Sequence, residues 1–194
     1  MASLTDFIVS KVRVKLLQSF LEDPREMYHV RALVRDTDEE INAVRRELAR
    51  MEECGLVKSE KRGNRLYYWF RKDYPFFQEL LSLIAKTTGL GSQIRKNIGK
   101  LGRVNFCLFS GEFARRAERK SADQVDVLVV GDIVLPELAN LIRQEEGTRG
   151  QEINYTPMTK EEFDFRKTRR DPFLLGILTS SRVMIIGDEQ EFTN

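Results

Sequence analysis

The residues from Tyr28 to Phe70 read YHVRALVRDTDEEINAVRRELARMEECGLVKSEKRGNRLYYWF. Two short helical patterns come first, and two strand patterns follow around a Gly-Asn turn. In the second helical pattern, apolar side chains recur every three or four residues, at Ile41, Val44, Leu48 and Met51, and form one apolar face. This order predicts two helices followed by a β-hairpin.

Capping signals set the expected bounds of the second helix. Thr37 precedes Glu40 by three residues, which is the spacing of a capping box, and we expect the helix over residues 39–53. Gly55 is the expected left-handed residue at its end.

The hairpin follows directly. Residues 56–61 and Arg65–Phe70 are rich in Val, Tyr, Trp and Phe and predict two strands. Gly63-Asn64 is a turn dipeptide between them, and Lys61, Arg62 and Arg65 crowd the tip.

Together these pieces resemble the winged helix-turn-helix DNA-binding domain of the ArsR and MarR type. The resemblance implies a recognition helix at residues 39–53, a wing at 56–70 and double-stranded DNA as the partner. Asn42 and Arg46 are the candidates for reading bases, and the tip of the wing for touching phosphate or the minor groove. The complete set of DNA-binding candidates is Thr37, Asn42, Arg45, Arg46, Arg50, Lys61, Arg62, Asn64 and Arg65.

Two of these assignments have a plainer alternative. The arginines at 45, 46 and 50 could form a solvated helix face paired with Glu47 or Glu53. Asn64 could be a turn residue and nothing more.

Composition excludes several classes of protein. The chain has 194 residues, 41% hydrophobic and 32% charged, which suits two small globular domains. A run of ~18 apolar residues is missing, so we expect no membrane span. The first residues lack a positively charged start followed by an unbroken apolar core, so we expect no signal peptide and a cytoplasmic location. Cys54 and Cys107 lie far apart, and with one histidine they predict neither a disulfide framework nor a zinc site. The net charge is only +2, but residues 93–120 form a basic segment, which is either a solvated surface or a polyanion contact.

Gly89 to Gly91 mark the expected boundary between two domains. We expect a DNA-binding domain at residues 1–74, opened by a helix over 4–21, and a linking helix within 75–91. That helix, PFFQELLSLIAKT, is apolar on more than one side, which favours a homodimer or a domain bridge over an internal core role.

Strand and helix patterns alternate in residues 92–194, so the whole chain is expected to be α+β, with a small mixed sheet in its second domain. The expected strands are 104–109, 125–130, 152–156 and 182–186. The expected helices are 92–101, 112–120, 135–145, one starting at Lys160 behind a Thr159 cap, and one starting at Pro172 behind Asp171.

The run FSGEFARRAERKSADQVDVLVVGD resembles the signature of the minimal polymerase beta-like nucleotidyltransferases. The resemblance implies metal-dependent nucleotide chemistry, in which two aspartates at i and i+2 of a strand share a metal ion. Gly111 and Arg115 match the signature, but Glu112 stands in place of its serine and Gln124 in place of its first aspartate. Asp126 matches the second aspartate, and Glu152 would be the third carboxylate.

These departures predict an impaired site. A carboxylate ~4 Å from a phosphate charge costs about 4 kcal/mol at an effective dielectric of ~20, which weighs against a nucleotide beside Glu112. We therefore expect no catalytic residue, no metal and no cofactor, and a second domain that serves as a sensor, dimerisation surface or site for a protein partner. Asp126 and Glu152, the only metal ligands left, could instead be polar residues that bond a loop.

The sequence thus predicts a sequence-specific DNA-binding transcriptional regulator that carries a nucleotidyltransferase-like pseudoenzyme domain. One alternative is an active nucleotidyltransferase, which would use Mg²⁺ and a nucleoside triphosphate to modify a protein or RNA. The other is a protein-interaction module that binds no DNA.

Overall fold

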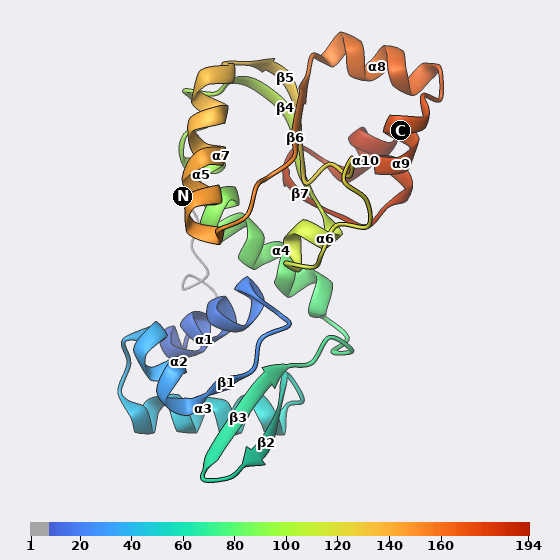
Figure 1. Ribbon diagram of the computed structural model, residues 1–194. Helices are drawn as coiled ribbons and strands as arrows, with labels where there is room; N and C mark the ends of the chain where they lie inside the picture. The colour runs from blue at the N-terminus through green and yellow to red at the C-terminus, as the bar shows by residue number, and fades with distance from the viewer. Residues whose placement is uncertain (1–7) are drawn as a thin grey trace. The chain divides into compact units, whose positions relative to one another are not determined.

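The computed structural model describes residues 8–194, which divide into two compact units after Thr87 (Figure 1). Both units mix helices with a small sheet, so the α+β class is confirmed. The first residues of the helix expected over 4–21 lie outside the described range. No helix formed by residues 8–194 has the length and apolar character needed to cross a membrane.

The first unit contains four helices and three strands in the part of the chain that is described. In order they are α1 (Lys11–Glu22), β1 (Tyr28–His29), α2 (Val30–Thr37), α3 (Ile41–Glu53), β2 (Val57–Arg62), β3 (Arg65–Phe70) and α4 (Phe77–Thr87). The strands form an antiparallel sheet in the order β1-β3-β2. The expected hairpin is therefore confirmed, and its turn is helped by Gly63 at φ +59°.

The predicted cap of the second helix is wrong. Thr37 is the last residue of α2, is buried, and donates its hydroxyl to the carbonyl of Leu33 at 2.6 Å. Asp38 at φ +51° ends α2, and Glu40 caps α3 by accepting from the amides of Asn42 and Ala43. A carboxylate is favoured there because the amino end of a helix carries partial positive charge.

The start of the first helical pattern also differs from expectation. Tyr28 and His29 pair with Tyr68 and Tyr67 of β3 as a strand. His29 then caps α2, because its Nδ1 accepts from the amide of Ala32 at 3.0 Å.

The expected linking segment 75–91 is two helices, divided between the units at Thr87. Phe77, Leu81 and Ile84 of α4 are buried in the first unit, while α5 (Gly89–Lys96) belongs to the second. The homodimer stays a prediction.

Glu47 of α3 is buried between two arginines. Its carboxylate pairs with Arg13 of α1 at 2.9 Å and with Arg50 at 2.8 Å. Burial alone would raise the pKa of Glu47, but these two partners outweigh it and lower the pKa.

This lowered pKa predicts an acid-sensitive contribution to stability. The stabilisation is fully present above the pKa of the unfolded chain, 4.5, and is lost as the pH falls through the folded value. We expect Glu47→Gln to reduce the difference between the urea midpoints of unfolding at pH 7 and about pH 3. Glu53→Gln, which alters an exposed residue of the same helix, should leave that difference unchanged; an equal change in both variants would contradict the assignment.

The second unit is built on a four-stranded mixed sheet. Its elements after α5 are β4 (Gly102–Ser110), α6 (Gly111–Ala114), β5 (Val127–Ile133), α7 (Leu135–Arg149), β6 (Tyr155–Met158), α8 (Lys160–Thr168), α9 (Pro172–Thr179), β7 (Arg182–Ile186) and α10 (Glu189–Thr193). The strand order is β6-β5-β4-β7, with only β5 and β6 parallel. The mixed sheet and the caps Thr159 and Asp171 are confirmed.

Helices cover both faces of this sheet (Figure 1). On one face, α8, α9 and α10 contribute Phe163, Leu174 and Phe192 to a core with Phe106 and Leu128 of the strands. On the other face lie α5 and α7 (Figure 1). The helix expected over 112–120 is a single turn, and the strand expected at Glu152 begins only at Tyr155, so Glu152 lies in a loop.

Gly131 lies inside β5, although the strand expected from the sequence stops at residue 130. It has φ +145°, beside a register shift in β4. A Cβ there would stand 2.0 Å from the carbonyl oxygen of Arg103, so the position requires glycine.

We expect Gly131→Ala to lower the free energy of unfolding by about 2–3 kcal/mol, because the backbone of β4 must move. Gly147→Ala in α7 is the matched control, since a Cβ there meets nothing within 4 Å, and it should raise stability by about 0.5–1 kcal/mol. Urea unfolding of both variants checks this; two changes of the same sign would contradict it.

Candidate nucleic-acid interface and the pocket of the second unit

A groove of about 1070 Å³ runs between α2, α3 and the tip of the hairpin. Four arginines from these three elements line it: Arg31, Arg35, Arg45 and Arg65. Its remaining lining is His29, Val30, Val34, Asn64, Leu66 and Tyr68. The set contains no carboxylate, so the groove is electropositive.

The pairing of arginines in the first unit is uneven. Residues 8–87 contain ten arginines. Five of them form salt bridges: Arg13, Arg25, Arg50, Arg62 and Arg71. Within the described residues, the other five form none: Arg31, Arg35, Arg45, Arg46 and Arg65. Four of these five line the groove, and all five are exposed.

The predicted DNA-binding residues fall into two groups. Arg45, Asn64 and Arg65 line the groove, and Asn42, Arg46 and Lys61 are exposed nearby in the chain. Three others are engaged or hidden. Arg50 pairs with Glu47, as expected if this arginine belongs to a solvated helix face and not to a DNA contact. Arg62 pairs with Glu60 at 2.9 Å. Thr37 is buried, so its predicted contact with DNA is wrong.

Arg31 and Arg35 were missed by the sequence reasoning. They stand four residues apart on α2 and therefore share one face of that helix. This spacing could have indicated a basic face on the helix, but nothing in the sequence places that face beside Arg45 and Arg65.

The second unit has a pocket of about 280 Å³ where the nucleotidyltransferase resemblance expected its site. Glu112 and Gln124, the two altered positions, both line it. Their side chains are in contact, since Gln124 Nε2 donates to Glu112 Oε2 at 3.0 Å. Lys120 pairs with the other carboxylate oxygen of Glu112 at 2.6 Å. Burial would raise the pKa of Glu112, but the hydrogen bonds from Lys120, the backbone amide and Gln124 outweigh it and lower the pKa.

Gly111 is required by a close approach of two segments. Its amide donates to the carbonyl of Ser181 at 2.7 Å, and a Cβ would meet Ser181 Oγ at 2.0 Å. Arg115 reaches the same hydroxyl at 3.5 Å. Both residues therefore position the loop that precedes β7.

The predicted metal ligands do not face this pocket. Asp126 is buried and its Oδ2 binds Arg119 Nη2 at 2.7 Å and the amide of Asn154 at 2.9 Å. Arg119 also donates to the backbone carbonyl of Glu152, whose side chain is exposed. The guanidinium of Arg119 thus already pairs with Asp126, and its contact with Glu152 is to the backbone and not to the carboxylate, so this arrangement does not fit a magnesium ion held by the two carboxylates. Among the described residues, no three His, Cys, Asp or Glu side chains are grouped to hold a metal.

These contacts support the interpretation of Asp126 as a residue that bonds a loop.

A scan against protein-family models gave no match, and neither did searches of curated proteins and of solved structures.

Proposed function

We propose that the first unit binds double-stranded DNA and that the chain is a sequence-specific regulator of transcription. The observation that carries the proposal is the distribution of arginine charge. Five guanidinium groups of this unit have no salt bridge in the described structure, and four of them converge on one groove. Guanidinium groups bind phosphate oxygens in a bidentate manner, which suits a polyanion.

The groove and the exposed face of α3 have complementary roles in this proposal. The four arginines of the groove, Arg31, Arg35, Arg45 and Arg65, contact the phosphate backbone and fix the register of the duplex. Asn42 and Arg46 are exposed on α3, and their amide and guanidinium groups are suited to adenine and guanine edges respectively.

The acidic turn before α3 limits how DNA approaches. Asp38 and Glu40 lie in the turn, while Glu39 beside them is paired with Lys15 at 2.6 Å. The pKa of Glu40 is lowered, first by its hydrogen bond from the Asn42 amide. This turn repels phosphates, so the backbone is expected to approach from the side of α2 and the hairpin.

Fluorescence anisotropy with genomic duplexes, including the upstream region of the protein's own gene, tests this proposal. If the four arginines of the groove each neutralise one phosphate, log K falls with log salt at a slope of about −3.6. Tight binding to a few duplexes at ~150 mM salt supports a regulator. Binding that is weak for every duplex would favour the protein-interaction alternative.

The proposal includes the homodimer that the sequence predicts. Sedimentation equilibrium of the full chain, with and without DNA, tests it. A monomer in both conditions would restrict the chain to a single half-site.

A further inference from the structure

The pocket of the second unit has its own ligand chemistry, independent of DNA binding. Its floor is apolar and comes from Leu108 of β4, Val125, and Phe173 and Ile177 of α9. Its rim holds polar and charged side chains from the loop 120–125 and from residues 180–182. Its volume of about 280 Å³ is just below the ~300 Å³ at which ligand pockets usually begin, so it suits a ligand of few atoms.

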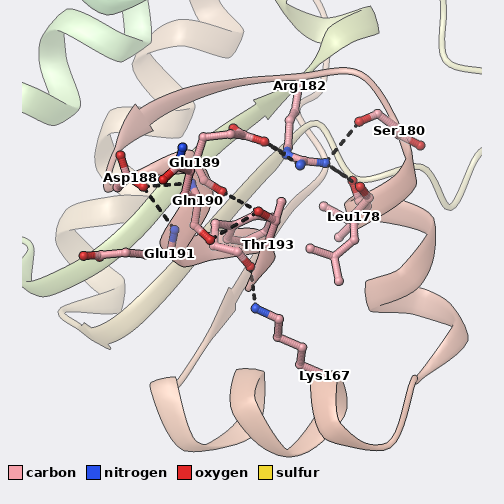
Figure 2. Close-up of polar contacts among 11 residues, drawn as sticks. Lys167, Leu178, Ser180, Arg182, Asp188, Glu189, Gln190, Glu191 and Thr193 are labelled. Atoms are coloured by element: carbon pink, nitrogen blue, oxygen red, sulfur yellow. Dashed lines mark hydrogen bonds and ion pairs between the residues drawn. The ribbon is translucent and has the colours of Figure 1, made fainter.

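The positive charges that line the pocket are already committed. Arg182 donates through Nε to Glu189 at 2.8 Å and through Nη1 to the carbonyl of Leu178 at 2.7 Å (Figure 2). Nη1 also donates to the carbonyl of Ile177 at 3.0 Å. Lys120 is paired with Glu112. Neither cation is free to hold a phosphate or a carboxylate.

Only one of the two carboxylates that line the pocket is balanced by a cation, since Lys120 pairs with Glu112. Glu112 and Asp123 both line the pocket. Asp123 has no hydrogen bond or salt bridge in the described residues. Two carboxylates and two cations cancel formally, but Arg182 is neutralised by Glu189, which is not a lining residue. The lining therefore has an effective charge of about −1, which favours cations.

We propose that this pocket binds a small organic cation, an amine or amidine on a flat apolar body, without a metal ion. The apolar body packs between Phe173, Ile177 and Val125, and the positive end lies beside Asp123. A nucleoside triphosphate is disfavoured, because its phosphates would meet two carboxylates and no uncommitted cation.

Benzamidine and benzoate are suitable probes, because they match in size and differ in the sign of their charge. With the full-length chain, ligand-observed NMR titration is expected to show benzamidine binding near a Kd of about 1 mM and benzoate at least ~10-fold more weakly. Equal binding of both probes, binding of benzoate alone, or tighter binding of ATP with Mg²⁺ would overturn the proposal.

Two variants locate the binding site. Asp123→Asn is expected to weaken benzamidine roughly 10-fold, whereas Asp132→Asn, an exposed acid on β5, should leave it unchanged. Gly176→Leu should abolish binding, because a Cβ at this lining position meets nothing within 4 Å and the larger side chain can enter the cavity. Unchanged binding by the Gly176→Leu protein, with its fold verified by circular dichroism, would place benzamidine elsewhere and contradict the proposal.

Discussion

Replacing Arg31, Arg35, Arg45 and Arg65 with alanine is expected to weaken DNA binding about 1000-fold at ~150 mM salt. Each lost phosphate contact removes roughly 1 kcal/mol, and every 1.4 kcal/mol is a factor of ten. The salt slope should also fall by about 3.6, since each contact contributes ~0.9. Anisotropy across a salt series measures both quantities in one experiment. Because these side chains are exposed and form no salt bridge in the described structure, the fold should tolerate the change.

A control with the same change in charge separates the groove from net charge. Alanine at Lys11, Arg25, Lys72 and Lys86 removes four cations that do not line the groove. This variant should lose less than about 10-fold in affinity. Equal losses in the two variants would mean that DNA responds to total charge, and the assignment of the groove would be wrong.

Arg119→Ala is expected to lower the free energy of unfolding by about 3 kcal/mol. Asp126 has a side chain only 4% exposed, and Arg119 is the one cation that pairs with it in the described residues. Removing one partner leaves a buried charge uncompensated. The partial exposure of Arg119, 22%, keeps the estimate at the lower end of the range for buried pairs. Urea unfolding measures the effect.

The surface control for this change is Arg143→Ala, since Arg143 is exposed on α7, and it should alter stability by less than about 0.5 kcal/mol. The double variant Arg119→Met/Asp126→Leu should recover much of the loss, because it buries no charge. A loss below about 1 kcal/mol for Arg119→Ala would show that Asp126 is readily released. The reading of Asp126 as a metal ligand would then regain support.

Local signals in the sequence predicted several elements correctly. The β2–β3 hairpin follows from its strand-forming residues and the Gly63-Asn64 turn. The caps Thr159 and Asp171 mark α8 and α9, and Asp171 accepts from the amides of Phe173 and Leu174. Each of these features depends on hydrogen bonds between residues close in the chain, so a short window of sequence contains the necessary information.

Other local predictions were overruled by the surrounding structure. Thr37 has the spacing of a capping box, but α2 extends through it and buries its hydroxyl. Tyr28 and His29 follow a helical pattern, but pairing with β3 makes them a strand. Thr37 bonds to Leu33 inside α2, whereas Tyr28 and His29 pair with residues about forty positions away in the chain. In both cases another hydrogen-bond partner competes with the one that the local pattern predicts.

The sequence alone determined the α+β class, most element positions and the presence of arginines on α3 and the hairpin. The tertiary structure decided which charges are free. It places Arg31, Arg35, Arg45 and Arg65 in the lining of one groove. Arg50 and Arg62 instead form salt bridges, with Glu47 and Glu60 respectively. In the second unit, Asp126 forms a salt bridge with Arg119, and Glu112 accepts a hydrogen bond from Gln124. The physical reason is range: helices, caps and turns are set by neighbours along the chain, whereas the pairing of a charge depends on packing between segments that the sequence separates.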